Sequence, residues 1–536
     1  MRTTFFGLNI AVKGLQTQQR ALDVTGHNIA NANTPGFTRQ NAVIGTTTPW
    51  TMPGMNKAYQ AGQVGTGVQV QEIRRIRDNF IDLQVRNESK ELGYWESRAD
   101  VLQKIEVVVN EPSDSGVRTV LDQFWESMQE LSKNPESQAV RATVRQRAIA
   151  VADTFNHIDR QLHELQQDIN ATVNVKVDEI NSLATQIRDL SFQIVRVEAN
   201  KFENANDLRD RRDNLLDQLS KIADIRYIED PDGSVRVSVG GKALVTGTRT
   251  FELAAVNKGD MNGVFTVEWK DGTPLYLSSG ELKGYIEAVG YMDANGVQQG
   301  IIPSMMKEMD HLANSIVTAV NWVHMQGYSL AGEDGILFFN QQQVEDPDNP
   351  GNFLLAPINA RNMKVSQAII DDPSKIAASR DMDAEGNTIP GDNTNALALA
   401  ELKHKLTVVT DANYTLSPIA IGVPDGSTTD YFQFLQGFLA DNLTEPLEPT
   451  ATFDDYFRGI IGQLGINTQE AERMALNQDM LVGQQMNRRE ILSGVSLDEE
   501  MSSMIMFQHA YNAAARAIST MDEMLDVLIN RVGAGR

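Results

Sequence analysis

The most regular pattern of apolar residues lies near the C-terminal end of the 536-residue chain. Apolar side chains recur there at alternating spacings of three and four residues, which is the repeat of a helix that packs along another helix. The positions are Met504, Phe507, Tyr511, Ala514, Ile518, Met521, Leu525 and Leu528. We therefore expect a helix from about residue 497 to residue 531 that contributes to a coiled coil.

A less complete stripe of apolar residues lies near the N-terminus. Its members recur every seven residues and are Leu8, Leu15, Leu22 and Ile29. The companion positions of this heptad hold Val12, Gln19 and Gly26, of which only the first is a large apolar residue. Because a seven-residue repeat places side chains on one face of a helix, we expect an N-terminal helix with half of a coiled-coil contact surface.

The N-terminal stripe ends in a segment rich in asparagine, GHNIANANTPGFTRQ, at residues 26–40. The residue before a proline is disfavoured in the helical region, and asparagine and glycine tolerate left-handed backbone conformations. The helix should therefore end before Pro35, and the chain should bend at Gly36.

The two terminal stripes also predict how the chain behaves alone. One complete and one incomplete stripe bury too little apolar surface to offset the conformational entropy of ordering both segments. We expect the termini to be largely disordered in the isolated monomer and to become helical when they pack against other chains. The alternative is a terminal helix that docks on its own domain.

Long helices are expected in the interior. Residues 136–230 contain neither glycine nor proline. Two stripes with three-four spacing lie in this run, at Ile158, Leu162, Leu165 and Ile169 and at Ile180, Leu183, Ile187, Leu190, Ile194 and Val197. This pattern is typical of helices in a bundle.

The period changes to two between residues 222 and 277, where Asp-Gly pairs at 232–233 and 271–272 indicate hairpin turns. Helical patterns return at about 302–326, 394–406 and 469–490, while 327–391 is rich in loops and not assigned. The sequence thus predicts a mainly α protein with a β insertion: elongated and multidomain, with terminal helices in a coiled coil, a central helical bundle and a small antiparallel β domain.

These patterns divide the chain into five segments. Residues 1–75 and 491–536 are the two parts of an inner coiled-coil domain. Residues 76–221 and 281–490 are the two parts of a helical domain, and residues 222–280 form the β domain.

Composition limits the possible partners and compartments. The 71 acidic and 47 basic residues give a net charge of −24, which disfavours nucleic acid or an anionic membrane as a partner. The chain has no cysteine, so disulfides, thiolate nucleophiles and cysteine-bound zinc are excluded. The N-terminus lacks the pattern of a cleaved signal peptide, and no run of 18 apolar residues indicates a membrane span. Export, if it occurs, should therefore use a route without a cleaved signal.

No pattern of catalytic or cofactor-binding residues is evident. The seven histidines are scattered, and phosphate-binding loops and a nucleophile elbow are missing from the sequence. His163-Glu164 begins a zinc-peptidase motif, but Gln167 stands where the second histidine would be. We expect no enzyme activity, no cofactor and no metal at this motif.

Two charged segments leave alternatives open. Residues 381–392 resemble a calcium-binding loop but end in Asp392 rather than glutamate, so a solvated turn and a calcium site both remain. The arginines Arg74, Arg75 and Arg77 indicate either a solvated strand edge or a contact with an acidic partner.

The two ends of the chain resemble a known family. LNIAVKGLQTQQRALDVTGHNIANANTPGFTRQ resembles the N-terminal signature of bacterial flagellar axial proteins, the rod, hook and hook-associated family. LSGVSLDEEMSSMIMFQHAYNAAARAISTMDEMLDVLINRV is similar to the C-terminal signature of that family. The interior resembles its hook-filament junction branch in GVQVQEIRRIRDNFI, DLRDRRDNLLDQLSKIADIRY, ANSIVTAVNWVHMQGYSLAGEDGILFF and GDNTNALALAELK. Residues 339–391 are too few for the large second outer domain of some members.

The resemblance implies a structural adaptor of the bacterial flagellum that connects hook to filament by polymerising through its terminal helices. Implied partners are further copies of this chain, the hook protein, a second junction protein or the filament, the flagellar type III export apparatus and an export chaperone. The implied location is extracellular. The residues expected at the assembly interface are Leu8, Leu15, Leu22, Ile29, Asn33, Pro35, Gly36, Phe37, Met504, Phe507, Tyr511, Ile518, Met521, Leu525 and Leu528.

Three other functions remain open at this point. A hook or distal-rod protein would share both ends but should lack the long helical interior. A secreted enzyme mounted on the flagellum would need a catalytic cluster in an insertion. A coiled-coil adhesin would use exposed loops of the β domain.

Overall fold

The longest described element of the molecule is a single helix. Helix α4, Gln138–Glu198, continues for 61 residues because no glycine or proline interrupts it, and the Ser137 hydroxyl caps its start by accepting from the Val140 N–H. Its buried face includes Ile158, Leu162, Ile180 and Ile187. The predicted interior helices are therefore confirmed.

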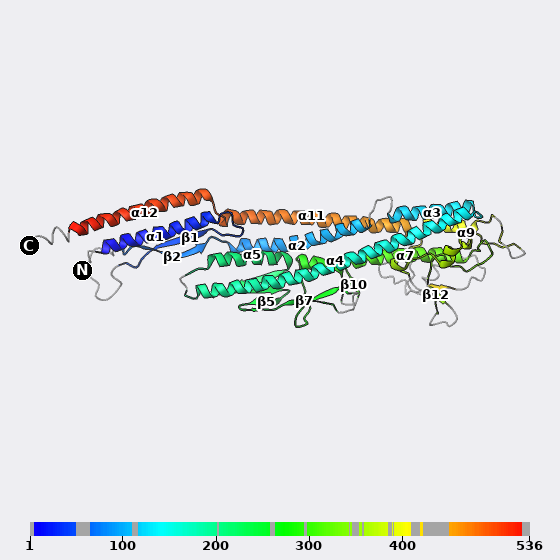
Figure 1. Cartoon of the computed structure of the whole chain (residues 1–536), viewed down its shortest axis with the longest axis horizontal. Coiled ribbons are helices and arrows are strands. Elements are labelled where there is room, and N and C mark those ends of the chain that lie inside the picture. Colours follow the sequence, from blue (N-terminus) through cyan, green and yellow to red (C-terminus); the bar gives the residue numbers. More distant parts are fainter. Residues whose placement is uncertain are drawn as a thin grey trace, which may run out of the picture.

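The other long helices run beside α4 or parallel to its length, which makes the molecule elongated (Figure 1). Helix α11, Phe453–Ser493, lies along α2, Asn79–Val109. Against α4 pack α3 (Val117–Lys133), α5 (Asn206–Ile222), α6 (Glu281–Val289) and α7 (Ile301–Met325). A buried cluster of aromatic rings, in which Trp125 stacks on Phe453 at 5.8 Å between centroids, joins α3 to the start of α11.

The computed structural model describes residues 5–49, 65–109, 116–200, 203–257, 263–293, 297–341, 343–345, 353–355, 358–383, 388–389, 391–408, 419–421 and 450–527. Shorter elements complete the described helical part. They are α8 (Gln367–Asp371), α9 (Thr394–Glu401) and the 3-10 helices Ala360–Asn362, Pro373–Lys375 and Leu402–His404. Strands β9 (Tyr291–Met292) and β10 (Gln298–Gln299) pair with each other, and β11 (Gln343–Glu345), β12 (Phe353–Leu355) and β13 (Ile419–Ile421) form a sheet.

The predicted antiparallel β region is confirmed, and it consists of two sheets. Strands β3 (Ile225–Glu229), β4 (Val235–Val239), β5 (Lys242–Thr246) and β6 (Arg249–Thr250) form the first sheet, and β7 (Leu253–Asn257) and β8 (Phe265–Trp269) form the second. Two asparagines of α4 hold the second sheet in place. Asn181 Oδ1 accepts from the Leu253 N–H at 2.9 Å, and Asn170 Oδ1 accepts from the Phe265 N–H at 2.8 Å.

The terminal helices form an antiparallel pair that extends beyond the helical body (Figure 1). Helix α1 is Phe6–Ala30 and helix α12 is Leu497–Asp526. A hairpin of β1 (Gln40–Thr46) and β2 (Val68–Arg75) packs on α1. The coiled-coil prediction for the two ends is confirmed as a pairing within one chain, whereas the hairpin adds sheet structure to a segment that was expected to be part of a coiled-coil domain.

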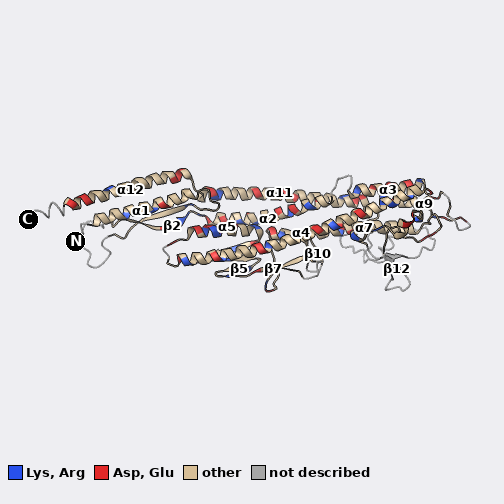
Figure 2. Ribbon diagram, viewed as in Figure 1, with Lys and Arg blue, Asp and Glu red and all other residues tan. Residues whose placement is uncertain are grey.

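Acidic and basic side chains are interspersed along the described helices rather than separated onto different elements (Figure 2). The division of the chain into five domains stays a prediction. Within the described residues, α11 ends at Ser493, close to the expected start of the C-terminal segment at residue 491.

Candidate assembly interface

A stripe of small residues on α1 makes the closest contact with α12. A Cβ atom added to Gly7 would lie 2.9 Å from Met521 Cε, and one added to Gly14 would lie 3.9 Å from Ala514 Cβ. From the first pair to the second, the position advances seven residues in α1 and retreats seven in α12. This constant register places Ala21, which is buried, opposite Phe507. Small residues let the two backbones approach, which explains glycines that cost an isolated helix about 0.5–1 kcal/mol each relative to alanine.

The same register ends in a buried polar contact. Asn28 Nδ2 donates to Glu500 Oε2 at 3.0 Å, and Arg39 Nε donates to Glu500 Oε1 at 2.7 Å. Asn28 also exchanges two hydrogen bonds with the backbone of Gln40. Glu500 is only 3% exposed, so its carboxylate depends on these donors. The contact therefore fixes one end of the terminal helix pair and joins it to the hairpin.

The predicted leucine stripe lies beside the closest contact, not in it. Leu8, Leu15, Leu22 and Ile29 each follow a member of the small-residue stripe by one position, which is about 100° around the helix, and all four are half-buried. The helix pair therefore leaves part of this stripe open. Sequence reasoning overlooked the small-residue stripe, although the seven-residue repeat Gly7, Gly14, Ala21 and Asn28 could have indicated it.

The predicted stripe of α12 is half-buried against α1. It comprises Met504, Phe507, Tyr511, Ile518, Met521 and Leu525, whereas Leu528 lies outside the described residues. A different side of α12 exposes Leu497, Met501 and Ile505, which are spaced one helical turn apart. Glu500 alone is buried among the residues of α12 as described, so this helix has apolar side chains that no other part of the described chain covers.

The asparagine-rich turn connects α1 to the helical body. Gly36 adopts a φ of +80°, and a Cβ there would lie 3.2 Å from Asn214 Nδ2 of α5. Phe37 is half-buried with its ring edge-on to His27 at 5.4 Å between centroids, while Asn33 and Pro35 are exposed. The Arg39 N–H donates to the carbonyl oxygen of Ser493 at 2.9 Å. The chain therefore bends where the sequence predicts, and it is tied at both sides of the bend.

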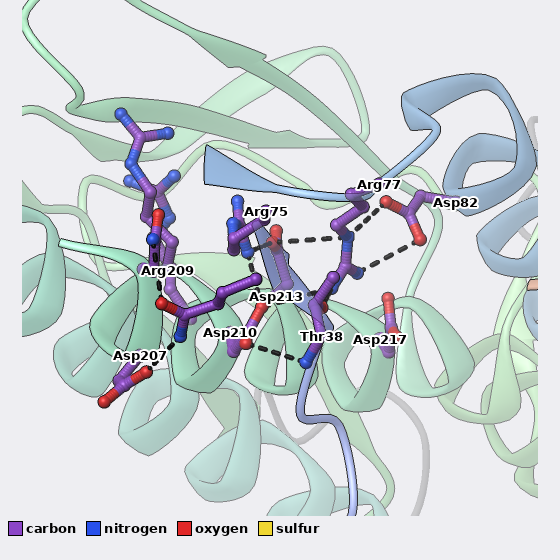
Figure 3. Close-up of polar contacts among 12 residues, drawn as sticks. Thr38, Arg75, Arg77, Asp82, Asp207, Arg209, Asp210, Asp213 and Asp217 are labelled. Carbon is purple, nitrogen blue, oxygen red and sulfur yellow. Dashed lines mark hydrogen bonds and ion pairs between the residues drawn. The ribbon is translucent and has the colours of Figure 1, made fainter. Parts of the chain in front are cut away.

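A cluster of arginines and aspartates contacts Thr38, which follows this turn (Figure 3). Arg75 Nη1 contacts Asp210 Oδ1 at 2.7 Å and Asp213 Oδ2 at 2.8 Å. Arg77 Nε contacts Asp82 Oδ2 at 2.6 Å. The Thr38 N–H donates to Asp210 Oδ2 at 2.9 Å. The interpretation of Arg75 and Arg77 as a solvated edge or a partner contact is therefore wrong, because carboxylates of the same chain bind both; Arg74 is exposed.

The cluster joins four elements. Arg86 of α2 contacts Asp217 of α5 at 2.6 Å, and Arg489 of α11 contacts the same carboxylate at 2.6 Å. The aspartates Asp210, Asp213 and Asp217 lie on one face of α5 because they are spaced three and four residues apart. This acidic face could have been recognised in the sequence, but its arginine partners come from more than 100 positions away in the chain.

Burial and the neighbouring arginine charges shift the pKa values of the aspartates in this cluster in opposite directions. Burial alone would raise the pKa of Asp213, but the charges of Arg77, Arg75 and Arg86 outweigh it and hold the pKa at about 2. For Asp210 burial prevails and raises the pKa, with Arg75 offsetting only part of the effect. The arrangement can hold the hairpin and the terminal helix pair against the helical body.

The described residues contain no group of three or more histidine, aspartate or glutamate side chains placed to hold a metal ion. His163 lies 3.3 Å from Asp159 on the same helix. Of the calcium-like segment, residues 384–387 and 390 lie outside the described part, and Asp392 accepts from the backbone N–H groups of Arg380 and Thr394. No helix in the described ranges is both long enough and apolar enough to cross a membrane.

Comparisons with known proteins match the chain along its length. Residues 102–339 match the family model of the flagellar hook-associated protein FlgK helical domain. Residues 8–38 match the flagella basal body rod protein family, and residues 492–531 match the C-terminal family of the flagellar basal body rod FlgEFG proteins.

Full-length relatives are also similar. The chain is 35% identical to flagellar hook-associated protein 1 of Bacillus subtilis (strain 168), with all of both chains covered. It is 25% identical to flagellar hook-associated protein 1 of Escherichia coli (strain K12), covering 98% of this chain and 99% of the relative. The solved structure of the flagellar hook junction protein FlgK from Burkholderia pseudomallei has a similar fold. Its TM-score is 0.57 at 15% identity, and the match covers 77% of this chain and 100% of that chain.

Proposed function

This chain belongs to the flagellar hook-associated protein 1 family, and we propose that its paired terminal helices are the part that polymerises to join hook to filament. The chain is a structural protein of the flagellar hook-filament junction. Neighbouring copies would contact the exposed part of the leucine stripe on α1. They would also contact Leu497, Met501 and Ile505 on α12.

The observation that carries this proposal is the small amount of α12 that is buried within one chain. Glu500 is its single buried residue over Leu497–Asp526, and large apolar side chains point away from α1 on another side. Exposed apolar surface of this extent is typical of a protein that packs against another. Further copies of the chain would cover it and complete the coiled coil.

The proposed partners are the flagellar components on either side of the junction. Relatives are named hook-associated protein 1 and hook junction protein, and we propose that one neighbour of this chain is the hook protein and the other a second junction protein or the filament. The helical and β regions, which lie away from the terminal pair, would face outward from the tube (Figure 1).

We further propose that the protein has no catalytic activity and acts extracellularly, after export through the flagellar type III apparatus without a cleaved signal. An export chaperone would cover the apolar stripe of α12 before assembly. This part of the proposal rests on family membership together with the exposed apolar side chains of α12, which would promote aggregation in the cytosol.

The rival flagellar assignments are less well supported. A hook or distal-rod protein would match the two terminal families, but here residues 102–339 match the FlgK helical domain. Nothing in the described residues favours an adhesin or a mounted enzyme over the junction protein.

The proposal can be tested by placing a charged side chain in the exposed part of the leucine stripe. Leu15→Asp should abolish incorporation at the hook tip while the helical body stays folded, because an unpaired carboxylate in an apolar contact costs several kcal/mol. Gln19→Asp, on the exposed surface of the same helix, is the matched control and should leave filaments normal. Filaments of normal number and length with Leu15→Asp would contradict the proposal.

A further inference from the structure

A groove of about 860 Å³ lies between the asparagine-rich turn, α5 and α11. Its apolar lining includes Val482 and Met486 of α11, Leu92 of α2, Ile222 of α5 and Pro35 of the turn. The function proposed above uses the terminal helix pair, so it leaves this groove without an occupant.

Another side of α11 carries a stripe of strongly exposed apolar residues. Leu476, Met480 and Ile491 are 66%, 65% and 87% exposed. They are spaced four and eleven residues apart, close to one and three helical turns, and therefore share a side of the helix. A Cβ added to Gly483, in the same stretch, would have no atom within 4 Å, so this side of α11 is open to close approach. We call these residues the outer stripe.

The groove and the outer stripe lie at the same level of the molecule. Val482 and Met486 project into the groove from the turns of α11 between Met480 and Ile491. Because successive residues are about 100° apart around a helix, Val482 and Met486 lie about 80° or more around α11 from each member of the outer stripe. One molecule therefore presents an apolar ridge on one flank and a partly apolar groove on another.

Two charges next to these surfaces are complementary. Arg488 is exposed close to the outer stripe, and Glu490 lines the groove. Neither side chain makes an ion pair within the described part of the chain. In the contact that we propose below, Arg488 of one copy would approach Glu490 of the next.

We propose that the outer stripe of one copy packs into the groove of the adjacent copy. The contact is heterologous, since it joins two different surfaces, and a heterologous contact repeats into a ring or a helical tube. This inference rests on the proposed function, because the terminal helices must first bring copies together. It adds a lateral contact in the helical body, which would hold neighbouring copies together outside the inner tube.

Paired cysteines can test this contact cleanly because the chain has no cysteine of its own. Ile491→Cys combined with Gln218→Cys places one thiol on the outer stripe and one on an exposed position that lines the groove. Mild oxidation of flagella isolated from swimming cells should yield a ladder of covalent oligomers larger than dimers. The matched control combines Ile491→Cys with Gln193→Cys, which is exposed on α4 outside the groove, and should give no ladder.

Two results would overturn the proposal. Flagella that contain the double variant but give no ladder would exclude the lateral contact and leave the junction function intact. Dimers alone, formed equally by the single variant Ile491→Cys, would show that two outer stripes face each other and that the groove is not their partner. A failure of the junction function itself is distinguishable, because cells with Leu15→Asp would then form normal filaments.

Discussion

Asn28 donates to the carboxylate of Glu500 at 3.0 Å and so connects two helices whose contact residues are 472 positions apart in the sequence. Because Asn28 is near the end of α1 and Glu500 near the start of α12, the bond lies at one end of the terminal helix pair, which is the end nearest to the helical body (Figure 1). A buried polar contact at one position of a helix pair favours a single register, because any shift would remove the Asn28 donor from the buried Glu500 carboxylate. We infer that this contact selects the register that brings Gly7 and Gly14 against α12.

Replacing Glu500 by alanine should therefore disrupt the terminal pair. The variant leaves the Asn28 amide and the Arg39 guanidinium without their buried acceptor, at a cost of roughly 1–3 kcal/mol. Filament number should fall sharply while thermal unfolding of the helical body is unchanged. Glu499→Ala is the matched control, because Glu499 pairs with the same arginine at the surface and should contribute less than about 1 kcal/mol. Equal effects of the two variants would contradict a role for burial.

The small-residue stripe predicts different effects for two substitutions at Gly14. In Gly14→Ala the new Cβ would lie at an ordinary contact distance of 3.9 Å from Ala514 Cβ, so assembly should persist. The helix should also gain about 0.5–1 kcal/mol from the lower conformational entropy of alanine in the unfolded chain. Gly14→Leu should separate α1 from α12 and prevent incorporation, as measured by the number of hooks that carry filaments. Normal filaments with leucine would exclude close packing at this position.

The charged cluster predicts a large loss of stability for Asp213→Asn. The neutral amide leaves Arg75, Arg77 and Arg86 short of one carboxylate, although each keeps another, so the free energy of unfolding should fall by roughly 2–3 kcal/mol at neutral pH. Urea denaturation of the full chain measures this change. Asp100→Asn, which removes an exposed pair with Lys104, should cost less than about 1 kcal/mol.

The pH dependence of this effect follows from the lowered pKa of Asp213. A pKa of about 2 in the folded chain, below the ordinary value of 3.8, means that the carboxylate stabilises the fold at pH values above 3.8. That stabilisation is lost as the pH falls from 3.8 towards 2. A difference between the wild-type chain and Asp213→Asn that shrank between pH 7 and pH 5 would contradict the assignment.

Asp310 should behave in the opposite way. Its burial, with a further contribution from the charge of Asp159, raises its pKa to about 6, although the Ala360 N–H donates to Oδ1 at 2.7 Å. Because this pKa lies above the ordinary 3.8, the protonated form stabilises the fold below pH 3.8, and that stabilisation is lost as the pH rises through 6.

Asp310→Asn should consequently stabilise the chain by roughly 1–2 kcal/mol at pH 7.5, since the amide oxygen can still accept from Ala360 without carrying charge. The gain should vanish below pH 4. Asp153 is an exposed carboxylate on α4 without an ion pair in the described residues, so Asp153→Asn should leave the free energy of unfolding unchanged at pH 4 and at pH 7.5. A gain of the same size at pH 4 and at pH 7.5 would contradict the explanation from the raised pKa.

The long helices and the β region could be predicted because each depends on local periodicity. Helix α4 follows from ten apolar positions at three-four spacing, in two stripes within a run without glycine, and α7 and α12 follow from similar patterns. Helix α11 begins at Phe453, well before the expected residue 469. The sequence pattern missed its first turns because glycines at 459, 462 and 465 weaken the helical signal there.

The interface and the cluster were harder to predict for a physical reason. A search for large apolar residues selects Leu8, Leu15, Leu22 and Ile29, whereas close packing of helix backbones depends on small residues such as Gly7 and Gly14. The ion pairs of Arg75 with Asp210 and Asp213 join positions more than 130 residues apart. No local pattern encodes that proximity, so these arginines looked like surface charges.

Hydrogen exchange of α1 and α12, compared between the purified chain and assembled flagella, tests the central claim most directly. The account predicts fast exchange of residues 6–30 and 497–526 in the isolated monomer, where α4 is protected, and strong protection of the same residues after assembly. Terminal helices that are as protected as α4 in the monomer would contradict it, because the pair would then be complete within one chain and would need no neighbour.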